Sequence, residues 1–103
     1  MAEQNAHEPS REHAQERREE CRRKVRAWLY ERTTIAAHPK QIQRGLNAGH
    51  DHDFTLPEID SALAFLLGVR PEQVSQVRDE IGATSYYQIT SAGSVAHERD
   101  PLA

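Results

Sequence analysis

Residues 86–93 read Tyr-Tyr-Gln-Ile-Thr-Ser-Ala-Gly, and this segment is the most informative about the architecture. Because side chains alternate between the two faces of a strand, Tyr87 and Ile89 would point inward, and Tyr86 and Gln88 outward. Aromatic and β-branched residues favour this extended conformation. A strand of this kind, ending in Thr with a Gly shortly after, is typical of a hairpin arm that leads into a short closing helix.

An apolar pattern of Val74, Val77 and Ile81 precedes this strand and predicts its antiparallel partner. Residues 82–84, Gly-Ala-Thr, would form the turn between the two strands. The closing helix is predicted over residues 91–99, and a short tail follows it.

Upstream of the hairpin, the longest helical pattern covers residues 10–32, with Ser10 as its N-cap. Only its second half carries an apolar stripe at helical spacing, formed by Cys21, Val25, Trp28 and Leu29. Residues 1–10 lack apolar periodicity and include Pro9, so we expect them to form a disordered tail. The first half of the helix would be a solvated extension.

The second helical pattern begins at Pro39, a residue suited to a first helical turn, and ends at the Asn-Ala-Gly of residues 47–49. Ile42 and Leu46 lie four residues apart and give it one buried face. Before this helix, the β-branched residues 33–35 interrupt the helical pattern and predict a short strand.

The third helical pattern follows a polar His-Asp-His-Asp loop at residues 50–53. Thr55 would cap this helix, Pro57 and Glu58 would occupy its first turn, and Gly68 would end it. Its broad apolar face consists of Ile59, Ala62, Leu63, Leu66 and Leu67.

One compact core results if the hairpin packs along the side of the third helix. We expect this core to contain Trp28, Leu29, Ile42, Leu46, Ile59, Leu63, Leu66, Val77, Tyr87 and Ile89. Trp28 is the largest of these side chains, and its truncation would cost roughly 3–5 kcal/mol if it were fully buried.

The order helix-helix-helix-hairpin-helix resembles the winged helix-turn-helix family over roughly residues 20–98. The family's signature Tyr-x-hydrophobic-Thr-x-x-Gly is matched by Tyr87, Ile89, Thr90 and Gly93. This resemblance implies an α+β fold, with three helices, a two- to three-stranded antiparallel wing and a short C-terminal helix. The domain would span residues 11–99, between the disordered tail 1–10 and the tail 100–103. A plain three-helix bundle with a disordered end is the alternative.

In this family the third helix enters the major groove of DNA and the second helix crosses the backbone. The resemblance therefore implies a non-enzymatic, DNA-binding role in transcriptional or replication control. The positions it assigns to double-stranded DNA are Lys40, Arg44, Thr55, Ser61, Arg70, Arg78 and Thr84.

The charge pattern favours a second hypothesis. Residues 11–49 carry ten Lys or Arg against five acids, whereas residues 50–80 carry seven acids against two Arg. Glu58 and Asp60, on the third helix, would repel phosphates. A winged helix that has lost DNA binding and serves as a protein-interaction adaptor would explain this distribution of charge. Its contact residues would be Glu58, Asp60 and Tyr86. Self-association, for example as a homodimer, would explain it as well.

Composition excludes other classes of protein. The chain has 103 residues, a mean hydropathy of −0.81 and one cysteine, so we expect a soluble cytoplasmic protein without disulfides, membrane contact or cofactors. No phosphate loop or nucleophile motif indicates an enzyme.

Cys21 falls on the apolar stripe and is predicted to be an inert core thiol. His50 and His52, with His38 or His97 as further ligands, could hold a metal, but a polar loop explains them better.

Overall fold

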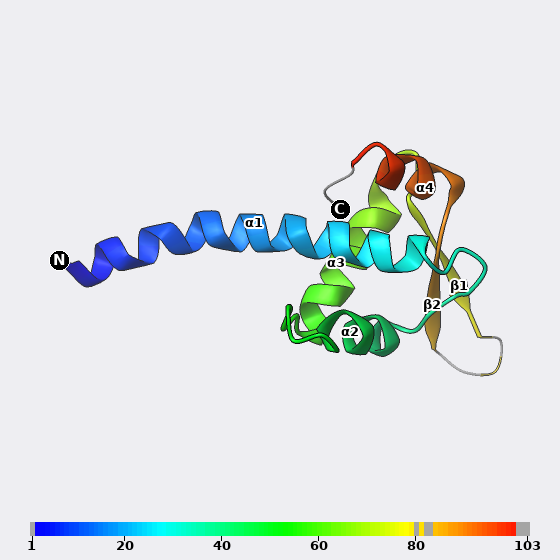
Figure 1. Ribbon diagram of the computed structural model, residues 1–103, viewed down its shortest axis with the longest axis horizontal. Helices are drawn as coiled ribbons and strands as arrows, with labels where there is room; N and C mark the ends of the chain where they lie inside the picture. Colours follow the sequence, from blue (N-terminus) through cyan, green and yellow to red (C-terminus); the bar gives the residue numbers. More distant parts are fainter. Residues whose placement is uncertain (1, 80, 82–83, 101–103) are drawn as a thin grey trace.

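The computed structural model describes residues 2–79, 81 and 84–100, with side chains from residue 13 onward. Along the chain the elements are α1 (Ala2–Tyr30), α2 (Pro39–Asn47), α3 (Leu56–Gly68), β1 (Val74–Arg78), β2 (Ser85–Ile89) and α4 (Ser91–Glu98). This is an α+β winged-helix fold, in which three helices precede an antiparallel hairpin and a short helix follows it (Figure 1). The predicted order of elements is confirmed.

Helix α1 is longer than predicted. It begins at Ala2, which corrects both the predicted start at Ser10 and the predicted disorder of residues 2–10. Ala, Gln and Glu are good helix formers, and extending an existing helix requires no new nucleus. Figure 1 shows the N-terminal half of α1 projecting from the body, away from the hairpin. No helix in the described part of the chain is apolar and long enough to cross a membrane.

Reciprocal capping boxes fix where α2 and α3 begin. At α2, His38 Nδ1 accepts from Lys40 N at 3.0 Å, and Gln41 Oε1 accepts from His38 N at 2.8 Å. At α3, Thr55 Oγ1 accepts from Glu58 N at 3.3 Å, and Glu58 Oε1 accepts from Thr55 N at 2.8 Å. These bonds satisfy N–H groups that a helix start leaves unpaired. The predicted starts of both helices are confirmed.

The hairpin is joined to the segment before α2. Val74 lies opposite Ile89 at the base of the β1–β2 ladder. A third strand is represented by one residue, because Ala37 and Tyr87 exchange two backbone hydrogen bonds of 2.8 Å. This position corrects the strand predicted at residues 33–35, most of which belong to the turn that ends α1.

The core lies where the helices meet the base of the hairpin. Its buried members are Cys21, Val25, Leu29, Ala37, Ile42, Phe54, Ile59, Ala62, Leu63, Leu66, Val74 and Ile89. Trp28, predicted as a core residue, is only partly buried and packs against this cluster. Val77, predicted as a core residue, is 47% exposed, which corrects that prediction. Ile81, predicted as part of the first strand, lies beyond the end of β1 at Arg78 and is 98% exposed. Val77 lies three residues after buried Val74, so the alternation of a strand places it on the opposite face.

The Thr-x-x-Gly of the signature has a structural role at the start of α4. Thr90 Oγ1 accepts from Gly93 N at 3.0 Å and donates to Glu72 O at 2.5 Å. A Cβ atom on Gly93 would lie 2.1 Å from Gln73 O, so only glycine permits this close approach. These contacts fasten α4 to the segment before β1.

Parts of the predicted turn and tail lie outside the described residues. Of the turn 82–84, only Thr84 is described, and its carbonyl accepts from Asp79 N at 3.1 Å. Of the tail 100–103, only Asp100 is described, and its carboxylate pairs with Arg26 at 3.2 Å.

Candidate nucleic-acid interface

Helix α3 has one buried face and one exposed face. The predicted apolar side chains of α3 point into the core or pack against it, and Asp60, Ser61 and Ala64 are exposed. Thr55 uses its hydroxyl to cap the helix. No Arg, Lys, Asn or Gln occurs in residues 56–68, so this face lacks the side chains that make bidentate contacts to guanine or adenine.

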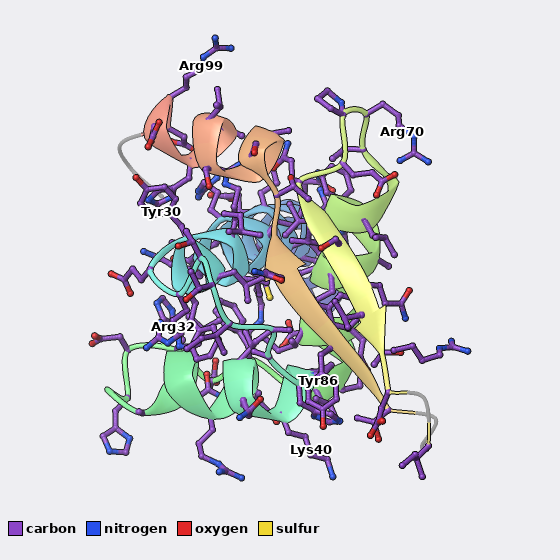
Figure 2. The ribbon with its side chains drawn as sticks, turned by 90° about the vertical axis from the view of Figure 1, so that its right-hand side faces the viewer. Tyr30, Arg32, Lys40, Arg70, Tyr86 and Arg99 are labelled. Atoms are coloured by element: carbon purple, nitrogen blue, oxygen red, sulfur yellow. The ribbon has the colours of Figure 1, made fainter. Side chains whose placement is uncertain are left out.

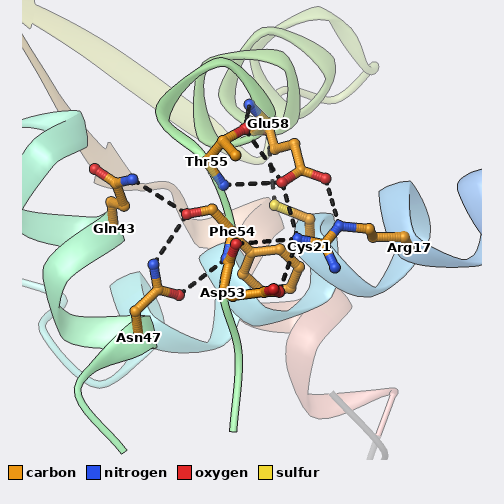
Figure 3. Close-up of polar contacts among 8 residues, drawn as sticks. All are labelled: Arg17, Cys21, Gln43, Asn47, Asp53, Phe54, Thr55 and Glu58. Atoms are coloured by element: carbon orange, nitrogen blue, oxygen red, sulfur yellow. Dashed lines mark hydrogen bonds and ion pairs between the residues drawn. The ribbon is translucent and has the colours of Figure 1, made fainter. Parts of the chain in front are cut away.

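Glu58 is held within the protein by Arg17 of α1 (Figure 3). Arg17 Nε donates to Glu58 Oε2 at 2.5 Å, and Nη2 donates to Oε1 at 3.0 Å. The same Nη2 donates to Asp53 Oδ1 at 2.9 Å. The hydrogen bonds from Arg17 lower the pKa of Glu58 to about 2, and those to Glu58 and Asp53 raise the pKa of Arg17. Glu58 is therefore charged at neutral pH, and Arg17 balances this charge.

Side chains from α2 clamp the connection between α2 and α3. Asn47 Nδ2 donates to Phe54 O at 2.9 Å, and Asn47 Oδ1 accepts from Phe54 N at 3.1 Å. Gln43 Nε2 donates to the same carbonyl at 3.1 Å, as Figure 3 shows. The His52 ring stacks on the buried Phe54 ring with centroids 5.1 Å apart. These contacts set the crossing of the two helices, and sequence analysis did not identify them.

The predicted contact residues of α2 are exposed to solvent. Lys40 and Arg44 are exposed and four residues apart, so both project from one side of α2. Figure 2 shows Lys40 pointing away from the body. Tyr86 is partly buried because the His38 ring meets it edge-on, with centroids 6.0 Å apart.

The remaining predicted residues are spread more widely. Arg78 is exposed at the end of β1, and Thr84 directly precedes the start of β2, so both lie toward the tip of the hairpin. Arg70 donates to two backbone carbonyls at the end of α3, at 3.0 and 3.2 Å. Figure 2 shows it at the end of the molecule opposite Lys40. The structure thus places Lys40 and Arg44 on one side of α2, with Arg70 at the other end of the molecule.

A groove separates the projecting part of α1 from the exposed face of α3. Its volume is about 300 Å³, and it is lined by Ala14, Arg17, Arg18, Cys21, Arg22, Pro57, Glu58, Ser61 and Ala62. The Arg22 guanidinium lies over the Phe65 ring, 3.7 Å from its centroid. Of the sites predicted from sequence, only Ser61 and Glu58 belong to this groove. The basic wall of this groove is indicated in the sequence by Arg18 and Arg22, which lie four residues apart in a basic run of the first helix.

The lone cysteine forms part of the groove floor. Cys21 is 2% exposed, and its Sγ donates to Glu58 O at 3.6 Å. Burial raises the pKa of the thiol to about 11. A buried thiol that stays protonated is a poor nucleophile, which is consistent with a structural role.

The histidines suggested as metal ligands have other contacts. His38 caps α2, His52 stacks on Phe54, and the His97 ring lies 4.3 Å from the Tyr30 ring. Among the residues that the structure describes, no group of three or more His, Cys, Asp or Glu could hold a metal ion.

The comparisons with known proteins support the class of fold that these elements define, a winged helix. By sequence, no known protein family and no curated protein matches the chain. By structure, the chain is similar to ZitR from Lactococcus lactis, solved as a double mutant in the apo form. The two share 13% identity with a TM-score of 0.55, over 99% of this chain and 72% of the ZitR chain. Similarity at this level of identity concerns the fold alone.

Proposed function

We propose that this chain is a small, non-enzymatic DNA-binding protein that acts in transcriptional or replication control. In a winged helix-turn-helix, the third helix lies in the major groove and the second contacts the backbone. The exposed face of α3 and the exposed cations of α2 would take these two roles. Arg78 and Thr84, in the hairpin, would reach an adjacent part of the duplex.

The observation that carries the proposal is the bidentate Arg17–Glu58 pair. By sequence, Glu58 stands as a free anion on the helix that should approach phosphates. In the structure, its carboxylate is bound on one side by Arg17 and on the other by the α3 cap. One of the two charges that oppose DNA binding is therefore compensated, and only Asp60 remains on that face.

The composition of α3 also sets the character of the binding. Lys40, Arg44 and Arg78 supply charges for phosphate contacts, which position a protein without reading sequence. Ser61 can hydrogen-bond to bases of more than one kind. We therefore expect weak sequence selectivity and strong dependence on salt concentration.

Fluorescence anisotropy with a labelled mixed-sequence duplex tests the proposal. Binding should weaken as salt rises from about 0.05 to 0.3 M, and Lys40→Gln/Arg44→Gln should make the log–log slope shallower by about 1.8, because each lost phosphate contact removes about 0.9. Asp60→Asn should tighten binding. Absence of binding by the wild type at the lowest salt would refute DNA as the partner.

The alternative, a protein-interaction adaptor, has one observation of its own. The outer face of the hairpin exposes Val77 and Ile81, which are apolar. Together with exposed Asp60 and the partly buried Tyr86, they would give a mixed surface suited to a protein. This function would be supported if the wild type does not bind DNA but captures a protein partner. The capture should be lost in Ile81→Ser and kept in Lys40→Gln/Arg44→Gln.

A further inference from the structure

The projecting helix α1 and helix α3 form two walls of one groove. Buried Cys21 lies between them, and its Sγ donates to the Glu58 carbonyl at 3.6 Å. On the α1 wall, Arg18 and Arg22 lie one helical turn apart and therefore on the same side. On the α3 wall lie Pro57 and Ser61, which are exposed. A long polymer that lies against the exposed face of α3 will therefore meet the Arg18–Arg22 row as well.

The three arginines of this groove differ in what balances their charge. Arg17 forms ion pairs with Glu58 and Asp53. Arg18 donates to the neutral amide of Gln15 at 2.5 Å, and the Arg22 guanidinium stacks on Phe65. Neither Arg18 nor Arg22 has an ion-pair partner among the described side chains. Stacking occupies the flat face of a guanidinium and leaves the N–H groups on its edge able to donate.

We propose that Arg18 and Arg22 bind phosphates of the DNA backbone, so that α1 serves as a second backbone-binding element beside α3. This inference rests on the proposed function, since it needs a duplex against the α3 face. Charge complementarity supports DNA as the partner. Helix α3 carries no Lys or Arg, and the Arg18–Arg22 row places two positive charges along the exposed edge of α3. The arginines would thus compensate for the acidic residue Asp60.

The test is the salt dependence of duplex binding by the full chain. Arg18→Gln/Arg22→Gln should make the log–log slope shallower by about 1.8. If the wild-type and variant lines meet near about 1 M salt, this slope corresponds to about 60-fold weaker binding at about 0.1 M. Arg18→Lys/Arg22→Lys keeps both charges and should restore most of the slope, although Lys would lose the planar stacking on Phe65.

Arg23→Gln is the matched control on the same helix. Arg23 lies in a different hollow, with Glu16 and Glu20, so its loss should leave the slope unchanged. Urea unfolding of each variant checks that the fold is intact, and the Lys variant separates loss of charge from loss of packing.

The outcomes distinguish this inference from the function on which it rests. If the wild type does not bind duplex DNA, both fail. If the wild type binds and Lys40→Gln/Arg44→Gln lowers the slope while Arg18→Gln/Arg22→Gln does not, only this inference fails. It also fails if the Arg18/Arg22 variant binds DNA normally but loses affinity for a polyglutamate peptide, because the row would then recognise an acidic protein.

Discussion

At the N-terminus of α3, Glu58 takes part in three kinds of contact. Its carboxylate accepts from Nε and Nη2 of Arg17 and from the backbone N–H of Thr55, and its own N–H donates to the Thr55 hydroxyl. It therefore joins the projecting helix to α3 and completes the helix cap. A residue that the charge pattern assigned to an external partner is engaged inside the protein.

The charge on Glu58 should make stability depend on pH. Its pKa is lowered to about 2 from the ordinary value of 4.5, so the ionised form is stabilised in the folded state. This stabilisation is complete above about pH 5 and is lost as the pH falls toward 2. Glu58→Gln keeps a capping side chain but removes the charge, and should lower the free energy of unfolding by about 1–2 kcal/mol at pH 7.

Urea unfolding of wild type and variant at several pH values provides the measurement. The gap between them should close as the pH approaches 2. Asp60→Asn, two residues further along the exposed face of α3, should change stability by less than about 0.5 kcal/mol at any pH. A gap that stays constant from neutral to acidic pH would rule out the ion pair as its source.

At the scale of elements, the caps and apolar periods were readable from sequence because they depend on neighbours in the chain. Thr55 with Glu58 three residues later, and Leu63 with Leu66, are local patterns of this kind. Arg17 lies 41 residues from Glu58, and Asn47 reaches Phe54 across a loop, so no local pattern reports either contact. Val77 was misplaced because its apolar character was given more weight than the period of the strand.

The docking of α4 gives a second prediction. Gly93→Ala places a Cβ atom 2.1 Å from the backbone oxygen of Gln73, which cannot move as a flexible side chain would. We expect a loss of about 1–3 kcal/mol in the free energy of unfolding. Gly68→Ala is the matched control: nothing lies within 4 Å of its Cβ, so this variant should be neutral or slightly more stable.

Thermal or urea unfolding followed by circular dichroism measures both glycine variants. If Gly93→Ala is as stable as the wild type, then α4 shifts without cost, and the contact with Gln73 does not fasten it. Equal losses at both positions would indicate a general effect of glycine replacement instead of the specific clash.

At the scale of the whole molecule, the single cysteine reports on opening of the core. Cys21 is buried between α1 and α3, and its raised pKa of about 11 leaves little thiolate near pH 8. We expect labelling by a chromogenic disulfide reagent to be on the order of 10³-fold slower, or more, than in concentrated urea. Its rate should rise with urea in parallel with global unfolding. Fast labelling without urea would mean that α1 separates from α3 while the rest stays folded.

The projecting helix also affects how the molecule moves in solution. The principal extents are 54 × 33 × 28 Å, and the radius of gyration of 15.1 Å exceeds the roughly 13 Å of a globule of this length. Tumbling is therefore anisotropic: spinning about the long dimension is faster than end-over-end rotation. Figure 1 shows α1 running along that dimension. The N–H bonds of a helix lie nearly parallel to its axis, so those of α1 sense mainly the slower rotation, and their nuclear relaxation will differ from that of the sheet.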